Sequence, residues 1–79
     1  MQKPTLYQLC TTHKLESMDT LFMLAKQSGV PKSIIDVMLI NSPVEESDAV
    51  KVLNALSQMT GQTWTLEHVD VKLVEISYG

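Results

Sequence analysis

The chain has 79 residues with a hydrophobic share of 44% and a charged share of 19%, which excludes a disordered tail and predicts one compact domain over residues 1–79. Six lysines and no arginine stand against nine acids, giving a formal net charge of −3, whereas nucleic-acid binders usually carry a basic excess. No apolar run approaches the roughly 20 residues of a membrane span, no signal peptide is evident, and one cysteine suits a reducing compartment, so we expect a cytoplasmic protein with no membrane partner.

Two helices are predicted in the first third of the chain. Residues 5–12 follow Pro4, a residue type favoured at helix starts, and carry apolar residues at i, i+3 and i+4. The second helix is expected to begin after Ser17, a good N-cap residue. It should end at Gly29, because glycine readily adopts the left-handed conformation that follows many helices.

A third helix is predicted for residues 31–40, although this stretch is rich in β-branched residues and its pattern alone also permits a strand. We favour the helix because Pro31 suits a first turn and because both neighbouring segments are helical. In this helix Ile35 and Met38 are expected to point into the core.

The fourth predicted helix has the strongest periodic signal of the chain, with apolar residues at i, i+3, i+4, i+7 and i+10, and it ends at Gly61. Two starts are consistent with the sequence: a capping box that begins at Ser42, or a later start near residues 46–47. After this helix, Thr65 is expected to cap one short turn, and Trp64 is expected to cover the C-terminal end of the helix.

A single β-strand is predicted for residues 70–77, with apolar side chains on both faces. The helical part, about residues 5–69, offers no second strand, and an unpaired strand leaves its backbone groups to water. The simplest expectation is antiparallel pairing with a second copy in a homodimer, with Val71 and Leu73 in the interface. The alternative is an extended tail that packs alone on the first and fourth helices.

A resemblance to a known family is visible around the second and third predicted helices. Residues 24–35 read Leu24-Ala25-Lys26-Gln27-Ser28-Gly29-Val30-Pro31-Lys32-Ser33-Ile34-Ile35. This stretch resembles the helix-turn-helix core of the Cro/phage-repressor (Xre-like) family. The resemblance implies a mainly α, lambda-repressor-like fold of four to five helices, with one C-terminal strand after them. It also implies a small DNA-binding transcriptional regulator that acts as a dimer on duplex DNA. The residues it assigns to DNA contact are Lys26, Gln27, Lys32, Ser33 and Asp36.

A second hypothesis keeps this scaffold but gives it a different partner. Ile34, Val37 and Leu39 are expected to lie toward the outer flanks of the third helix, and large apolar groups there indicate a covered surface. The scaffold would then be a protein-interaction module, such as an antitoxin or an accessory subunit, that does not bind DNA. The acidic balance of the chain favours this hypothesis, whereas the residues around Gly29 favour DNA binding.

Catalytic or metal chemistry is not expected. Cys10 and His13 could supply two metal ligands, but zinc sites use three or four, so we interpret them as a buried thiol and a surface imidazole. The five methionines are interpreted as core fillers. We therefore expect no enzyme activity, no catalytic residues, no metal and no cofactor.

Overall fold

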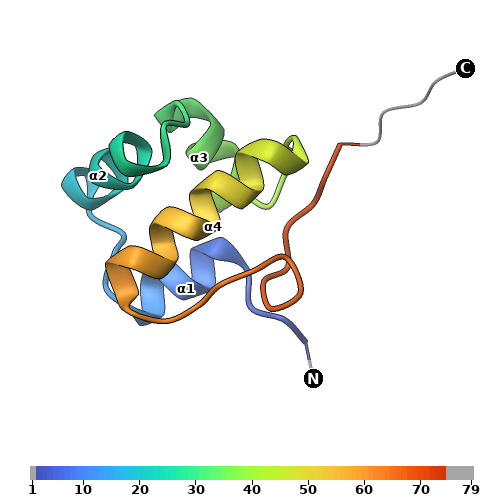
Figure 1. The fold of residues 1–79 in the computed structure, drawn as a ribbon, viewed down its shortest axis with the longest axis horizontal. Coiled ribbons are helices and arrows are strands. Elements are labelled where there is room, and N and C mark those ends of the chain that lie inside the picture. The colour runs from blue at the N-terminus through green and yellow to red at the C-terminus, as the bar shows by residue number, and fades with distance from the viewer. Residues whose placement is uncertain (1, 75–79) are drawn as a thin grey trace, which may run out of the picture.

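A computed structural model describes residues 2–74 of the chain, and its helices are α1 (Leu6–Thr12), α2 (Met18–Ser28), α3 (Lys32–Leu39) and α4 (Glu46–Thr60). Figure 1 shows α4 across the middle of the molecule, with α2 and α3 on one side of it and α1 on the other. The predicted mainly helical fold class is confirmed, and residues 32–39 are helical rather than extended. Within the described residues, none of the helices combines the length and apolar character needed to cross a membrane.

Local hydrogen bonds explain where the first two helices begin. The Thr5 hydroxyl accepts a hydrogen bond from the Gln8 N–H at 3.2 Å, and the Gln8 side chain accepts one from the Thr5 N–H at 2.9 Å. The Ser17 hydroxyl accepts a hydrogen bond from the Thr20 N–H at 3.2 Å. Each of these bonds satisfies a backbone N–H group that has no partner inside the helix. The predicted Ser17 cap is therefore confirmed.

The start of α4 is the later of the two predicted starts, and the capping box at Ser42 is wrong. The backbone is still extended at Glu45, and α4 begins at Glu46. The cause lies in Val44, whose side chain is buried in the core and whose N–H donates to the Lys72 carbonyl at 3.0 Å. Because this hydrogen bond requires an extended backbone at Val44, α4 cannot include Val44 and begins after it.

The core lies between α4 and the other three helices. Ile35 and Met38 of α3 are buried, as predicted. They belong to one cluster with buried residues that include Leu6, Leu9, Cys10, Leu24, Val30, Val44, Ala49, Val52, Leu53, Ala55, Leu56 and Val69. The prediction that the methionines are core fillers is wrong for Met18 and Met23, which are largely exposed on α2.

Residues 70–74 are extended and pair within the chain, so the prediction that no segment is available to pair with them is wrong. The Asp70 N–H donates to the Pro4 carbonyl at 2.8 Å, and the Val74 N–H donates to the Val44 carbonyl at 2.9 Å. These contacts form two isolated parallel bridges rather than a continuous strand. The rest of the predicted strand, residues 75–77, lies outside the described residues. The sequence does not reveal this pairing because each partner segment contributes only one bridged residue, which leaves no alternating pattern.

Candidate nucleic-acid interface

The turn between α2 and α3 consists of Gly29, Val30 and Pro31. Gly29 has a φ of +73°, in the left-handed region, and its N–H donates to the Ala25 carbonyl at 2.9 Å. Apart from Gly29 itself and its two chain neighbours, no described residue has an atom within 4 Å of the position that a Cβ at residue 29 would occupy, so the backbone conformation, rather than crowding, favours glycine here. Val30 is buried under the turn with 3% of its surface exposed, which holds α2 and α3 together.

Three of the predicted DNA-contact residues lie in the first turns of α3. Ser33 and Asp36 are exposed, whereas Lys32 is half-buried. The Lys32 ammonium donates to both carboxylate oxygens of Asp36, at 3.0 and 3.1 Å. The same Nζ atom lies 5.4 Å from the centre of the Phe22 ring on α2. The cation is therefore held against α2, and much of its charge is neutralised locally.

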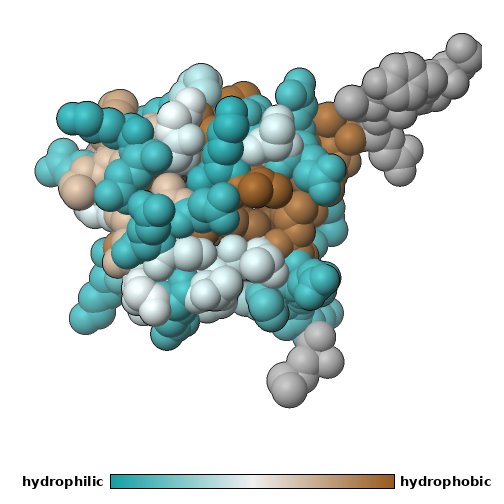
Figure 2. Space-filling view, in the orientation of Figure 1, coloured by the Kyte–Doolittle hydropathy of each residue, from teal (hydrophilic) through white to brown (hydrophobic). Residues whose placement is uncertain are grey.

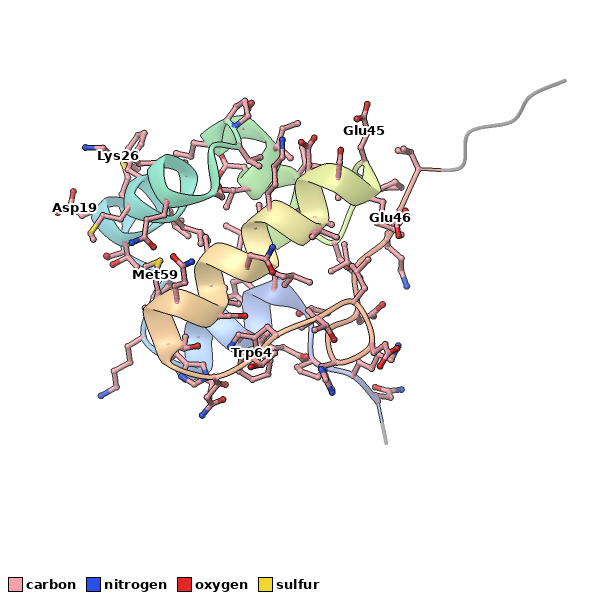
Figure 3. The ribbon with its side chains drawn as sticks, in the orientation of Figure 1. Asp19, Lys26, Glu45, Glu46, Met59 and Trp64 are labelled. Carbon is pink, nitrogen blue, oxygen red and sulfur yellow. The ribbon has the colours of Figure 1, made fainter. Side chains whose placement is uncertain are left out.

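Lys26 and Gln27, the other two predicted DNA-contact residues, are exposed in the last turn of α2. Figure 3 shows Lys26 and Asp19 pointing away from the body of the molecule at α2. On the opposite side of α3 in this view, Glu45 and Glu46 mark the N-terminal end of α4. The exposed surface around α3 is therefore mixed in charge rather than basic.

Ile34, Val37 and Leu39, which were expected toward the outer flanks of α3, are neither fully exposed nor fully buried. All three are partly buried and pack against the core of this chain, because α3 contacts α1, α2 and α4 on its inner side. The exposed apolar residue of this segment is Ile40, directly after the helix, with 74% of its surface accessible.

An exposed apolar cluster, made up of Met18, Phe22 and Met23, lies on α2 instead. More than half of each side chain is accessible to solvent. The spacing of Met18 and Phe22 at i and i+4 places them on one helical face, and this is the sequence signal that could have revealed the cluster. The core residues of α2, which include Leu24, obscure that signal, because they add apolar positions on other sides of the helix.

A groove of about 380 Å³ lies between α4 and the turn formed by residues 64–68. Apolar side chains that include Val50, Leu53 and Leu66 line it, and Figure 2 shows the corresponding brown surface in the middle of the displayed face. One edge of the groove carries His68, whose ring is hydrogen-bonded to the Thr65 hydroxyl at 2.8 Å. The groove therefore offers apolar contact and little chemistry.

Trp64 forms part of the same groove and is anchored to the end of α4, which confirms its predicted position over that helix end. Its N–H donates to the Ser57 hydroxyl at 2.7 Å, and its indole N–H donates to the Thr60 hydroxyl at 2.9 Å. The His13 ring packs edge-on against the indole, with the ring centres 5.8 Å apart. The chain after α4 is thus fastened by polar contacts that span as many as seven residues.

Cys10 is buried in the core, as expected. Burial, together with the nearby negative charge of Glu16, raises the pKa of the Cys10 thiol from 9.0 to about 11. A thiol with so high a pKa is a poor nucleophile and a poor metal ligand at neutral pH. Within residues 2–74, the structure contains no group of three or more histidine, cysteine or acidic side chains able to hold a metal ion.

Comparisons of the chain with protein-family models, with curated proteins and with solved structures gave no match. The candidate interface is therefore defined by its own geometry: two helices joined at Gly29, with polar residues exposed at the start of α3. The Lys32–Asp36 ion pair lies on this surface.

Proposed function

We propose that the chain is a small helix-turn-helix regulator that binds duplex DNA with α3 in the major groove. The observation that carries the proposal is the division of α3 into two faces. Ile35 and Met38 are buried, while Ser33 and Asp36 at the start of the helix are exposed. In helix-turn-helix proteins the N-terminal residues of the second helix reach base edges, and these are the polar, exposed positions of α3.

Each polar residue of this surface has a chemically suitable contact on DNA. Lys32 can donate to a phosphate or to the O6 and N7 atoms of guanine, and Ser33 can donate to either. Asp36 can accept a hydrogen bond from the amino group of cytosine. Lys26 and Gln27, at the exposed end of α2, suit phosphate contacts that set the orientation of the protein.

The charges predict weak binding. Lys32 has to leave the Asp36 carboxylate before it can contact DNA, and that carboxylate itself repels phosphates. If only Lys26 and Lys32 neutralise phosphates, log affinity should fall with log salt concentration with a slope of about −2. Glu45 and Glu46 lower the affinity further through their negative charge.

Titration of the chain with random-sequence duplex DNA at low and physiological salt tests the proposal. Lys32→Ala should weaken binding and make the salt slope shallower by about 1, because one phosphate contact is lost. Asp36→Asn should strengthen binding, because it releases Lys32 and removes a negative charge. The matched control is Lys51→Ala, which removes an exposed charge from α4 and should leave affinity unchanged. If the folded wild-type chain binds no DNA at low salt, the proposal is wrong.

A second candidate function is supported by the exposed apolar cluster of Met18, Phe22 and Met23. Three large apolar side chains on one short helix are unusual on a free surface and are typical of a protein-interaction site. In this alternative the scaffold binds a protein, as an antitoxin or accessory subunit would, and does not bind DNA. The mixed charge around α3 is compatible with such a partner.

Exchange of two cluster residues, in Met18→Ser/Met23→Ser, separates the two candidates, because it adds no charge and leaves the Phe22–Lys32 contact in place. The exposed positions should tolerate the change, so the free energy of unfolding should shift by no more than about 1 kcal/mol. If the second candidate is right, this variant should keep its fold but should no longer bind a protein that the wild-type chain binds. If binding of that protein survives in the double variant, the cluster is not its docking site.

A further inference from the structure

In the hydrogen bonds that residues 2–74 make among themselves, residues 70–74 use one edge of their backbone. In an extended segment, the backbone groups of successive residues point to opposite edges, so those of every second residue share one edge. The groups that pair belong to even-numbered residues: the N–H of Asp70 bonds to Pro4, and the carbonyl of Lys72 and the N–H of Val74 both bond to Val44. The opposite edge carries the N–H and carbonyl groups of Val71 and Leu73. Among residues 2–74, the structure contains no hydrogen bond to these groups.

This second edge is accessible and held in place. Figure 1 shows residues 70–74 at the periphery of the molecule, beside the start of α1 and the start of α4. The Val71 side chain packs against the core, which fixes the segment, while Leu73 and Val74 are more than one-third exposed. An ordered edge with unpaired N–H and carbonyl groups is a template for another extended segment.

We propose that this edge pairs antiparallel with the same edge of a second copy of the chain, about a twofold axis at Val71. Both backbone groups of Val71 then bond to Val71 of the other copy, which an antiparallel ladder allows. The charges on either side of Val71 are complementary, because Asp70 of each copy faces Lys72 of the other. Pairing about Asp70 or about Lys72 instead places like charges opposite one another, which is unfavourable.

The side chains are already arranged for this contact. The Lys72 ammonium lies 3.4 Å from the Asp70 carboxylate in the same chain, so both charges lie on one face of the segment. Both side chains are at least one-third exposed and can exchange partners without loss of core packing. A second copy is the favoured occupant because each copy supplies both charges, and because a chain of 79 residues has little core of its own. The proposal does not depend on DNA binding.

Sedimentation of the full chain over a range of concentrations tests the pairing. The wild-type chain should form a dimer, and Lys72→Glu should weaken it about tenfold, because two attractive cross-strand pairs become repulsive. Asp70→Lys should have a similar effect, and the exchange Asp70→Lys/Lys72→Asp should restore the dimer. The control Lys51→Glu makes the same charge change on an exposed part of α4 and should leave the dimer unchanged.

Amide hydrogen exchange identifies the interface independently of the charges. The Val71 N–H should exchange rapidly in dilute solution and become protected as the dimer forms. The Asp70 and Val74 N–H groups, which are hydrogen-bonded within the chain, should be protected from exchange in dilute and in concentrated solution alike. A chain that remains monomeric up to about 1 mM overturns the proposal. So does a dimer that survives Lys72→Glu while the Val71 N–H still exchanges rapidly.

Discussion

Ile35→Ala is expected to lower the free energy of unfolding by about 2–5 kcal/mol, which is a large part of the stability of a domain this small. The Ile35 side chain is fully buried, at 0% exposure, so its removal leaves a cavity among side chains of all four helices. Urea denaturation followed by circular dichroism measures the loss. If the remaining stability is too small, the variant should be unfolded without denaturant.

The same substitution five residues further on provides the control. Ile40 is 74% exposed, so Ile40→Ala should change the free energy of unfolding by no more than about 0.5 kcal/mol. Both variants remove the same atoms from the same region of the chain. Equal losses from the two substitutions would show that α3 does not bury the face described above.

Stability should fall steeply in alkaline solution because of Cys10. The thiol ionises at a pKa of 9.0 in the unfolded chain and of about 11 in the folded chain, where burial opposes its charge. A pKa that is raised on folding leaves stability intact below pH 9 and reduces it as the pH rises through about 11. The shift of about two units corresponds to a loss of about 3 kcal/mol above the folded-state pKa.

Comparison with Cys10→Ala isolates this contribution, because the two proteins share every other ionisable group. The variant should lose some packing energy at every pH, but its stability should depend less on pH between 9 and 11 than that of the wild-type chain. The ultraviolet absorbance of the thiolate reports the ionisation directly. Identical alkaline stability profiles for the two proteins would contradict the raised pKa.

Helix boundaries that depend on local chemistry could be predicted from the sequence. Ser17 accepts a hydrogen bond from a backbone N–H three residues away, and Gly29 and Gly61 adopt the left-handed conformation that ends α2 and α4. The inward positions of Ile35 and Met38 could also be predicted, because helical periodicity places them on one face. The five polar residues of the candidate interface were named from the resemblance of residues 24–35 to a helix-turn-helix core, and their contact with DNA stays a prediction.

The contacts that those polar side chains make depend on the tertiary structure. The i, i+4 spacing of Lys32 and Asp36 allows an ion pair, but the position of the cation beside Phe22 follows from the packing of α3 on α2. Periodicity also could not separate the partly buried Ile34 from the exposed Ile40. That difference depends on where neighbouring helices cover α3, which is decided by contacts distant in sequence.

The mainly helical character of the chain and most of its helix ends could be predicted from local patterns, because caps, glycines and periodicity act over a few residues. The start of α4 and the pairing of residues 72–74 depend instead on contacts that form only in the folded chain. Both depend on Val44, which accepts a hydrogen bond from Val74, 30 positions along the chain, and which gives no local signal of its role. One extended residue has no periodicity, so its pairing emerges only when the helices bring the two segments together.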